Sequence, residues 1–269
     1  MSAVTRHLLP GGERAATQLC ELGVRRGGAL LVHASMRAAG GGAGDMAHAL
    51  RRALGPAGTL VVPSFTPENS DTSRAYLDRV RGLSEEAAAA VRARMPAFDP
   101  AVSPAPTMGA LAEVVRLAPD ARRSSHPQTS FAGLGPAAVR LLTGHRPDCH
   151  LGEDSPLARL YEADAQVLLL GTGFDRCSAF HLAEYRRPAP PRRLYRCVMA
   201  SGEGRRWWEY EDVALDDSDF AGLGEDFVRA RPGAVSSGPV GAASGRLFRL
   251  RAAVDFAVGW LEERRAAGC

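Results

Sequence analysis

Three short apolar runs constrain the fold of this chain more than any other feature. They are GALLVHAS at 28–35, GTLVVPSFT at 58–66 and QVLLLGTG at 166–173. Runs of this length without polar alternation are typical of strands buried on both faces, as in parallel sheets covered by helices. DMAHALRRALG, between the first two runs, has helical periodicity and ends on Gly55. The order strand, helix, strand predicts a βαβ unit, and therefore a parallel pair of strands covered by helices.

Further segments predict additional elements. SPLARLYEA predicts a helix in which Ser155 is the N-cap and Pro156 the first helical residue. TMGALAEVVRLAP predicts a helix capped by Thr107, and GPAAVRLLTG, GEDFVRARP and GRLFRLRAAVDFAVGWLEERRAAG are also interpreted as helical. RRLYRCVMA and RRWWEYEDV alternate like antiparallel strands around the turn SGEG. The polar stretch 66–106, which ends in prolines, is interpreted as an insertion that covers the active-site end of the sheet.

Together these segments predict one α/β domain spanning residues 1–269. We expect a three-layer sandwich with a largely parallel central sheet and a C-terminal antiparallel extension. With 45% hydrophobic residues over 269 positions, the chain can bury a sizeable core. It contains no apolar run of roughly 18 residues and no secretory leader pattern, so we expect a cytoplasmic protein without a membrane segment.

Composition argues against several classes of function. The five cysteines are odd in number, scattered and never spaced C-x-x-C, which favours reduced thiols over disulfides or zinc ligands. The formal net charge is +3, but the basic residues are spread along the chain without aromatic interleaving, which argues against nucleic acid. All 33 basic residues are arginine, so a catalytic lysine is excluded. The sequence has no histidine motif for a metal and no G-x-S-x-G elbow of serine hydrolases.

The glycine-rich segment HASMRAAGGGAG, at 33–44, is a candidate anion site. It follows a strand and opens onto a helix, where backbone N–H groups and the helix dipole receive anions, and Ser35 adds a hydroxyl. Arg37, Gly40 and Gly42 match a short R-x-x-G-x-G pattern that many acetyltransferases place around pyrophosphate. The alternative interpretation is a flexible connection.

The segment CSAFHLAEYRR contains the main catalytic candidate, His181. This histidine follows the C-terminal end of a buried strand, where α/β sheets place ligands. Ser178 and Glu184 each lie one helical turn away and are expected on the same face. Imidazole titrates near neutral pH and therefore suits a general base. The alternative is a core histidine bonded to a backbone carbonyl, which is also our interpretation of His33; His126 could orient a loop or contact a ligand.

An acidic segment, WWEYEDVALDDSDFAGLGEDF, follows at 207–227. It contains eight carboxylates and no basic residue. These are Glu209, Glu211, Asp212, Asp216, Asp217, Asp219, Glu225 and Asp226. Such a segment can be a solvated edge, or it can form a negative wall that concentrates a polycationic ligand.

Six co-linear segments between Gly28 and Val213 resemble the aminoglycoside 3-N-acetyltransferase family. They are LLVHASMRAAGG, GPAGTLVVPSFT, FDPAVSPAPTMGALAEVVR, RSSHPQTSFAGLG, EDSPLARLYEADAQVLLLGTGFDRCSAFHLAEYR and WEYEDV. The resemblance implies an acetyltransferase that conveys antibiotic resistance, with acetyl-CoA as donor and no metal. Its acceptor would be the 3-amino group of a 2-deoxystreptamine antibiotic. Because EDVALDDSDF departs from the pattern of many members, a non-antibiotic amine is the alternative acceptor.

The resemblance also assigns residues to roles. The residues along the cofactor would be His33, Ala34, Ser35, Met36, Thr107 and Met108. For direct attack of the amine on the thioester, His181 would be the general base, with either Glu211 or Asp212 orienting the imidazole. Either Ser178 or a backbone N–H near Gly173 would donate to the oxyanion. Glu184 is the alternative orienting residue. Candidates for binding the acceptor's ammonium groups are Glu184, Asp216, Asp217 and Asp219.

Two rival functions remain open at this point. One is a hydrolase that uses Ser130 or Ser178 with His126 or His181. The other is a protein that binds or sequesters a cofactor without catalysis. Small molecules are the expected partners, and the chain would be a monomer or a homodimer.

Overall fold

The computed structural model describes residues 11–202 and 204–266, and its largest element is a seven-stranded sheet in the order β3-β4-β2-β1-β5-β9-β8. The three apolar runs form its centre as β1 (Ala29–Ala34), β2 (Thr59–Pro63) and β5 (Gln166–Leu170). β1 pairs in parallel with both β2 and β5. These three strands are buried almost throughout, as their unbroken apolar sequences require.

The outer strands of the sheet are antiparallel. β4 (Phe131–Leu134) pairs with β2, and the two-residue β3 (Arg122–Arg123) pairs with β4. On the other side β9 (Ala243–Arg249) pairs with β5, and β8 (Val235–Val240) pairs with β9. The expected α/β class and parallel centre are therefore confirmed, within a sheet that is mixed as a whole. The sequence patterns did not predict β3, β4 or β8.

The prediction that GRLFRLR begins a helix was wrong. Its first five residues, 245–249, lie in β9, and the C-terminal helix α11 begins only at Leu250 and runs to Ala266. Leu247 and Phe248 are successive buried residues that pack into the cores on opposite faces of the sheet. Burial alternates along β9 from Ala243 to Leu247, and Phe248 breaks the alternation, so the pairing of β9 with β5, rather than its sequence pattern, decides its conformation.

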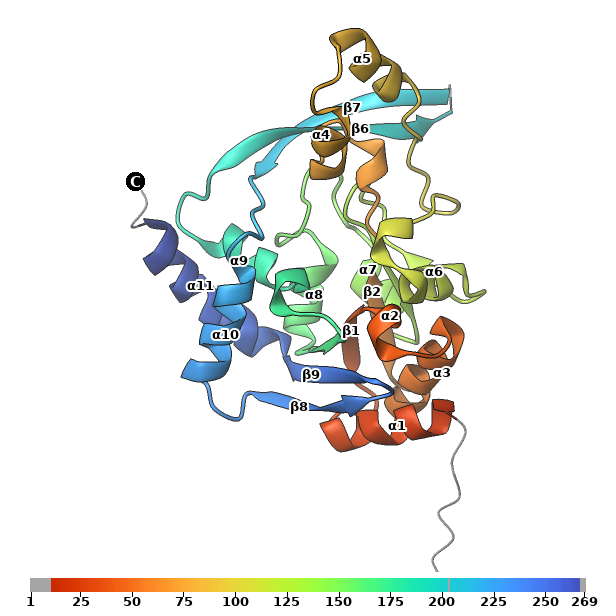
Figure 1. The fold of residues 1–269 in the computed structure, drawn as a ribbon, viewed down its shortest axis with the longest axis vertical. Coiled ribbons are helices and arrows are strands. Elements are labelled where there is room, and N and C mark those ends of the chain that lie inside the picture. The colour runs from red at the N-terminus through yellow and green to blue at the C-terminus, as the bar shows by residue number, and fades with distance from the viewer. Residues whose placement is uncertain (1–10, 203, 267–269) are drawn as a thin grey trace, which may run out of the picture.

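Helices cover both faces of the sheet, which confirms the three-layer arrangement (Figure 1). One core lies between the sheet and a first group of helices: α1 (Gly11–Leu22), α3 (Ala43–Leu54) and α6 (Ala110–Leu117). The other core is covered by α7 (Ala138–Leu142), α8 (Pro156–Glu162), α9 (Phe180–Arg186), α10 (Phe220–Ala230) and α11. Leu30 and Leu31 enter different cores, because successive strand residues point to opposite faces.

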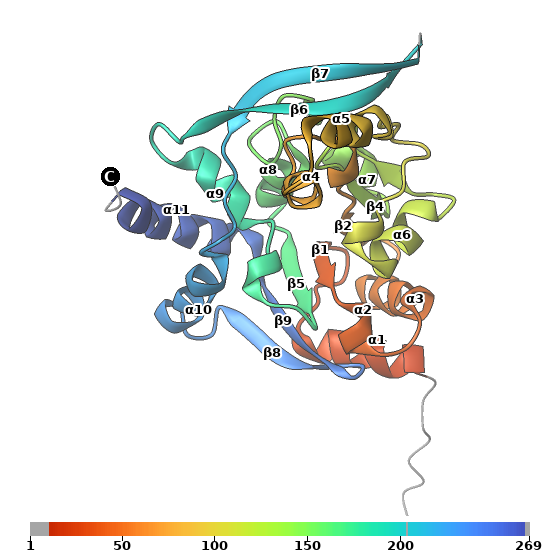
Figure 2. The same cartoon turned by 45° about the horizontal axis from the view of Figure 1, so that its top comes forward.

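A separate antiparallel ribbon, β6 (Arg192–Ser201) and β7 (Gly204–Val213), forms the predicted pair of strands. Its expected turn includes Glu203, which lies outside the described residues. The helices α4 (Arg74–Val80) and α5 (Glu85–Ala93) of the stretch 66–106 lie against this ribbon (Figure 2). The stretch is joined to β6 through bridges at Cys197 and Met199.

Two predicted helix starts had different outcomes. Ser155 caps α8, since its side chain accepts a hydrogen bond from the N–H of Leu157, and Pro156 follows at the first helical position. Thr107 does not cap α6. It lies in the 3₁₀ turn η2 (Pro106–Met108), and Gly109, with φ of 87°, precedes the helix instead.

The described cysteines, Cys20, Cys149, Cys177 and Cys197, are free thiols, as expected, and Cys269 lies outside the described residues. Burial raises the pKa of Cys149 to about 11 and the pKa of Cys177 to about 12. Within residues 11–202 and 204–266, the structure contains no helix with the length and apolar character needed to cross a membrane.

Candidate active site

A cavity of about 840 Å³ opens at the carboxyl ends of the parallel strands. The ends of β1 and β2 contribute Ala34 and Pro63, and Thr172 follows β5. Gly171, between β5 and Thr172, has φ of 63°, and a Cβ atom there would lie 2.7 Å from the side chain of Ala38. Glycine is therefore required at position 171, where the chain leaving β5 passes close to Ala38 of the short helix α2 (Met36–Ala39). The position agrees with the general location of ligand sites in α/β sheets.

The six residues expected along the cofactor all line this cavity. They are His33, Ala34, Ser35, Met36, Thr107 and Met108. Ser35 is the N-cap of α2, and its hydroxyl accepts a hydrogen bond of 3.4 Å from the N–H of Ala38. Arg37 also lines the cavity, at the beginning of the glycine-rich segment. The fold thus brings the continuous segment 33–37 and the distant turn η2 together at the cavity.

His181 reaches the cavity from the first turn of α9. After β5 the chain passes through the 3₁₀ turn η3 (Phe174–Arg176) and enters α9 at Phe180. The side chain of His181 is 14% exposed, and its ring lies 4.7 Å from the ring of Phe220 between centroids. Its Nδ1 atom is 2.6 Å from Oε2 of Glu184, three residues further along the helix. That contact leaves Nε2 as the ring nitrogen available to a ligand.

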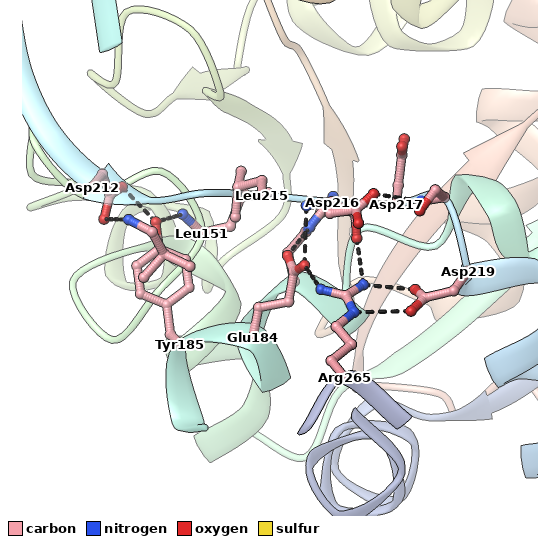
Figure 3. A network of polar contacts seen from close by, with 12 residues as sticks. Leu151, Glu184, Tyr185, Asp212, Leu215, Asp216, Asp217, Asp219 and Arg265 are labelled. Atoms are coloured by element: carbon pink, nitrogen blue, oxygen red, sulfur yellow. Dashed lines mark hydrogen bonds and ion pairs between the residues drawn. The ribbon is translucent and has the colours of Figure 1, made fainter. Parts of the chain in front are cut away.

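Glu184 is almost completely buried, and every side of its carboxylate is used. Oε2 contacts His181, while Oε1 accepts a hydrogen bond of 3.0 Å from the N–H of Asp216 and one of 2.5 Å from Arg265. Figure 3 shows the carboxylate of Glu184 facing the guanidinium group of Arg265. A buried carboxylate is tolerated only with such partners. Glu184 is therefore bonded to His181 and almost inaccessible, which contradicts the expectation that it binds an ammonium group of the acceptor.

The expected orienting residues Glu211 and Asp212 lie elsewhere, and that prediction is corrected. Glu211 faces outward from β7 and forms an ion pair of 2.8 Å with Arg192. Asp212 faces inward, where it accepts hydrogen bonds of 2.7 Å from the N–H of His150 and 2.5 Å from the hydroxyl of Tyr185. Burial raises the pKa of Asp212 despite these donors. Successive residues of one strand cannot share a face, and neither of these two contacts His181.

Ser178 lines the cavity but does not share a helix face with His181. It precedes α9, and its hydroxyl lies 3.3 Å from Nε2 of His33. Burial, together with the proximity of His181, lowers the pKa of His33 to about 3. The imidazole of His33 is therefore neutral at physiological pH. His33 is both a core residue of β1 and part of the cavity wall.

The three aspartates expected to bind ammonium groups separate in the structure. Asp217 lines the cavity and is 3.4 Å from Arg74 of α4. Asp219 forms two hydrogen bonds with Arg265, and Asp216 accepts a hydrogen bond from the N–H of Ser218. Of the three, only Asp217 lines the cavity.

His126 orients a loop, one of the two roles left open for it. It is fully buried, and its Nδ1 accepts hydrogen bonds from the N–H groups of Gln128 and Thr129. Its ring packs between the rings of His145 and His150, at 4.8 and 4.6 Å between centroids. Burial lowers the pKa of His126 well below its ordinary value.

The hydrolase alternative with Ser130 finds no support in this geometry. Ser130 is fully buried, donates to the carbonyl of Ser64 at 2.7 Å and accepts from Arg123 at 2.9 Å. Over the part of the chain that the structure describes, no group of three or more histidine, cysteine, aspartate or glutamate side chains is arranged to hold a metal.

Sequence reasoning missed three residues of this region. Phe220 packs on His181, Asp175 lines the cavity, and Arg265 binds Glu184. None of the three belongs to a local sequence motif. Arg265 is more than 80 residues from Glu184 in sequence, and no periodic pattern reports such a contact.

An imidazole that lines a cavity of an α/β sheet and is held by a buried carboxylate is the arrangement expected of enzymes that remove a proton from a bound substrate. The chain belongs to the aminoglycoside 3-N-acetyltransferase family, whose sequence model matches residues 31–262.

Individual relatives agree over nearly the whole chain. The sequence is 37% identical over 249 residues to the aminoglycoside N(3')-acetyltransferase-like protein YokD of Bacillus subtilis, covering 89% of this chain and 88% of that protein. It is 36% identical over 275 residues to aminoglycoside N(3)-acetyltransferase III of Serratia marcescens, covering 95% and 98%.

Solved structures show the same fold. The crystal structure of YokD matches with a TM-score of 0.86 and 34% identity, covering 94% of this chain and 99% of YokD. AAC-IIIb, solved as a binary complex with CoASH, matches with a TM-score of 0.80 and 32% identity over 95% and 97%. A mutant of AAC(3)-IVa in complex with a gentamicin matches with a TM-score of 0.78 and 31% identity over 99% and 96%.

Proposed function

We propose that this protein acetylates an aminoglycoside antibiotic, with acetyl-CoA as donor and the 3-amino group of 2-deoxystreptamine as acceptor, and thereby confers resistance. The observation that carries the proposal is the pair formed by His181 and Glu184 at the cavity. Family membership supports the reaction, and the relatives crystallised with CoASH and with gentamicin support the two substrates. Because acetyl-CoA is an intracellular metabolite, we place the reaction in the cytoplasm.

The pair supplies what the chemistry needs first. An ammonium group cannot attack a thioester, so the acceptor must lose a proton before its lone pair is available. Nε2 of His181 accepts that proton, while Nδ1–H donates to Glu184, whose negative charge stabilises the imidazolium. We assign the orienting role to Glu184 because it contacts the imidazole ring. Glu211 and Asp212 of β7, to which the family resemblance assigned this role, have other partners.

The transfer itself needs no covalent acyl-enzyme. The amine nitrogen forms a bond with the acetyl carbon, and the C–S bond of the thioester breaks in the collapse of the tetrahedral intermediate. The proton held by His181 can then pass to the departing CoA sulfur, and the second proton that the nitrogen loses on becoming an amide goes to solvent. Ser178 lines the same cavity and is our candidate donor to the oxyanion, a contribution that preorganised donors make to acyl transfer.

We place the donor along β1 and η2. A cavity of about 840 Å³ is within the usual range for sites that hold small molecules and cofactors. His33 to Met36 and Thr107 to Met108 form one wall, and Arg37 is the nearby cation for a phosphate group. The assignment is supported by the position of these residues at the C-terminal end of β1.

We place the acceptor at the opposite side of His181, beside Asp217 and Asp175, whose carboxylates suit a polycation. The ion pair between Asp217 and Arg74 brings the stretch 66–106 to the rim of the cavity. This contact supports the interpretation that the insertion covers the active-site end of the sheet.

A thiol-release assay across an amine panel tests the proposal. The panel contains kanamycin-like and gentamicin-like aminoglycosides, a spermidine-type polyamine and a simple primary amine. We expect CoA release that depends on the aminoglycoside, with a product whose acetyl group NMR places on N3. Release with the non-sugar amines alone would favour the non-antibiotic acceptor, and labelling by a covalent serine probe without transfer would favour a hydrolase.

A further inference from the structure

The C-terminal helix α11 places a cation against the carboxylate that holds the catalytic imidazole. Arg265 lies in the last turn of α11, and its Nη1 is 2.5 Å from Oε1 of Glu184. The same guanidinium group binds Asp219 through Nε at 2.9 Å and Nη2 at 2.6 Å. Nη2 also donates to the carbonyl of Asp216 at 2.7 Å (Figure 3).

These contacts use four of the five N–H donors of the guanidinium group. Its side chain is 16% exposed, so the ion pairs are screened less than surface pairs. Burial disfavours the charged guanidinium, but the hydrogen bonds to Asp219 and Glu184 outweigh this and raise the pKa of Arg265. The cation is therefore permanent, and a lysine, with three donors on a single nitrogen, could not reproduce four hydrogen bonds to three residues.

The two oxygens of Glu184 have divided roles. Oε2 faces His181 and Oε1 faces Arg265, so the guanidinium fixes the rotation of the carboxylate toward the imidazole. On its other side, Arg265 holds the backbone of the loop that precedes α10, next to Asp217 at the cavity. One residue thus connects the proposed base with the loop on the acceptor side.

We propose that Arg265 is a positioning residue for the general base. It holds Glu184 in the orientation that aligns His181, and it fixes the loop that carries Asp217. This inference rests on the proposed function, because it assumes that His181 accepts the proton. Arg265 lies beyond residue 262, where the match to the family's sequence model ends. Family membership alone therefore does not assign this role.

A double-mutant cycle tests whether Arg265 acts through Glu184. We expect Arg265→Met to lower kcat roughly 10- to 100-fold, the scale of loss from a misplaced reacting group, and to raise KM for the aminoglycoside. KM for acetyl-CoA should stay unchanged. In a Glu184→Gln background, adding Arg265→Met should lower kcat by less than roughly threefold, because residues that act through one another are not additive.

Arg264 provides a matched control. It precedes Arg265 on α11, but it pairs with Asp226 at 3.3 Å and lies over the ring of Trp260. Arg264→Met should keep kcat within roughly twofold of the wild type, since it shares no partner with Glu184. Arg265→Lys should give an intermediate kcat, because one contact of the fork can be kept. Thermal unfolding of each variant shows whether it is folded.

The outcomes separate this inference from the proposed function. A wild-type kcat in folded Arg265→Met, or a full multiplicative loss in the Glu184→Gln background, overturns the role of Arg265. A wild-type kcat in Glu184→Gln overturns the proposed pair, and this inference with it. Should Arg265→Met not fold, Arg265→Lys and Asp219→Asn are judged by the same criteria: unchanged kcat in both contradicts the inference.

Discussion

Two neighbouring residues of α9 have different tasks. Glu184 turns toward His181 and Arg265, whereas Tyr185 donates a hydrogen bond to Asp212 of β7. The first residue serves the site and the second ties the helix to the ribbon. The carboxylates of Glu184 and Asp212 are both buried and hydrogen-bonded. Removing a partner of either carboxylate leaves an uncompensated buried polar group.

At the residue scale, the acceptor side makes a specific prediction about Asp217. Asp217→Asn should raise KM for the aminoglycoside by roughly three- to tenfold and weaken its dependence on salt, because one carboxylate facing a polycation is lost. The kcat value should change little. Steady-state kinetics at two ionic strengths measures both effects.

A charge-matched control for that experiment is Glu225→Gln. Glu225 lies on α10 and pairs with Arg246 at 3.2 Å, and it is not part of the cavity wall. Glu225→Gln removes one negative charge, as Asp217→Asn does, but at a position away from the cavity. Equal effects of the two substitutions would mean that only the overall charge matters, and that Asp217 does not contact the acceptor.

At the element scale, two glycines of α10 have opposite environments. A Cβ at Gly224 would lie 2.0 Å from the ring of Phe174, whereas a Cβ at Gly222 would meet nothing within 4 Å. Gly224 thus allows α10 to approach η3, the turn that leads to His181. Close packing therefore requires glycine at position 224 but not at position 222.

This contrast predicts stability changes of opposite sign. Gly224→Ala should lower the free energy of unfolding by about 1–3 kcal/mol, because it overpacks a close contact. Gly222→Ala should raise it by up to about 1 kcal/mol, because alanine favours a helix. Urea denaturation of the two variants measures the difference. Equal changes of the same sign would show that α10 does not pack on η3 as described.

The sequence predicted the parallel centre of the sheet because β1, β2 and β5 carry unbroken apolar runs. It did not predict β4, since four residues beside prolines and histidines show no pattern, or β9, since its two buried neighbours face opposite cores. His181 could be found from its place after β5. Helical spacing showed that Glu184 could contact His181. The choice of Glu184 over Asp212 as the partner of His181 could not be made from the sequence, because it depends on which face of β7 carries Asp212.

At the scale of the whole molecule, a cluster of buried histidines joins the sheet to the ribbon. Nε2 of His150 lies 2.8 Å from the hydroxyl of Tyr210 on β7, and the His150 ring lies 4.6 Å from that of His126 between centroids. Burial lowers the pKa of His145 to about 4, and it lowers the pKa values of His126 and His150 well below the ordinary value. Protonation of His126 at Nδ1 would remove the acceptor of two backbone N–H groups.

The cluster predicts the pH dependence of stability. The folded state keeps these imidazoles neutral, whereas the unfolded chain binds protons below the ordinary histidine pKa of 6.5. The free energy of unfolding should therefore fall as the pH drops from about 6.5 toward 4, by up to roughly 1.4 kcal/mol per pH unit for each histidine. The raised pKa of Asp212 acts in the opposite direction.

Urea denaturation at about pH 7, 6 and 5 measures this slope. His48, an exposed residue of α3, provides a control, because His48→Gln should leave the slope unchanged. A free energy of unfolding that is constant over this range would mean that the cluster is not kept neutral by the fold.

The central claim is that His181, oriented by Glu184, removes the proton from the acceptor amine. The most direct measurement is kcat of His181→Ala with both substrates saturating, next to the affinity of the same variant for acetyl-CoA. The account predicts a loss of ~10²-fold or more in kcat with acetyl-CoA binding retained, in line with the removal of a general base. A folded variant that binds acetyl-CoA and turns over at the wild-type rate would contradict it.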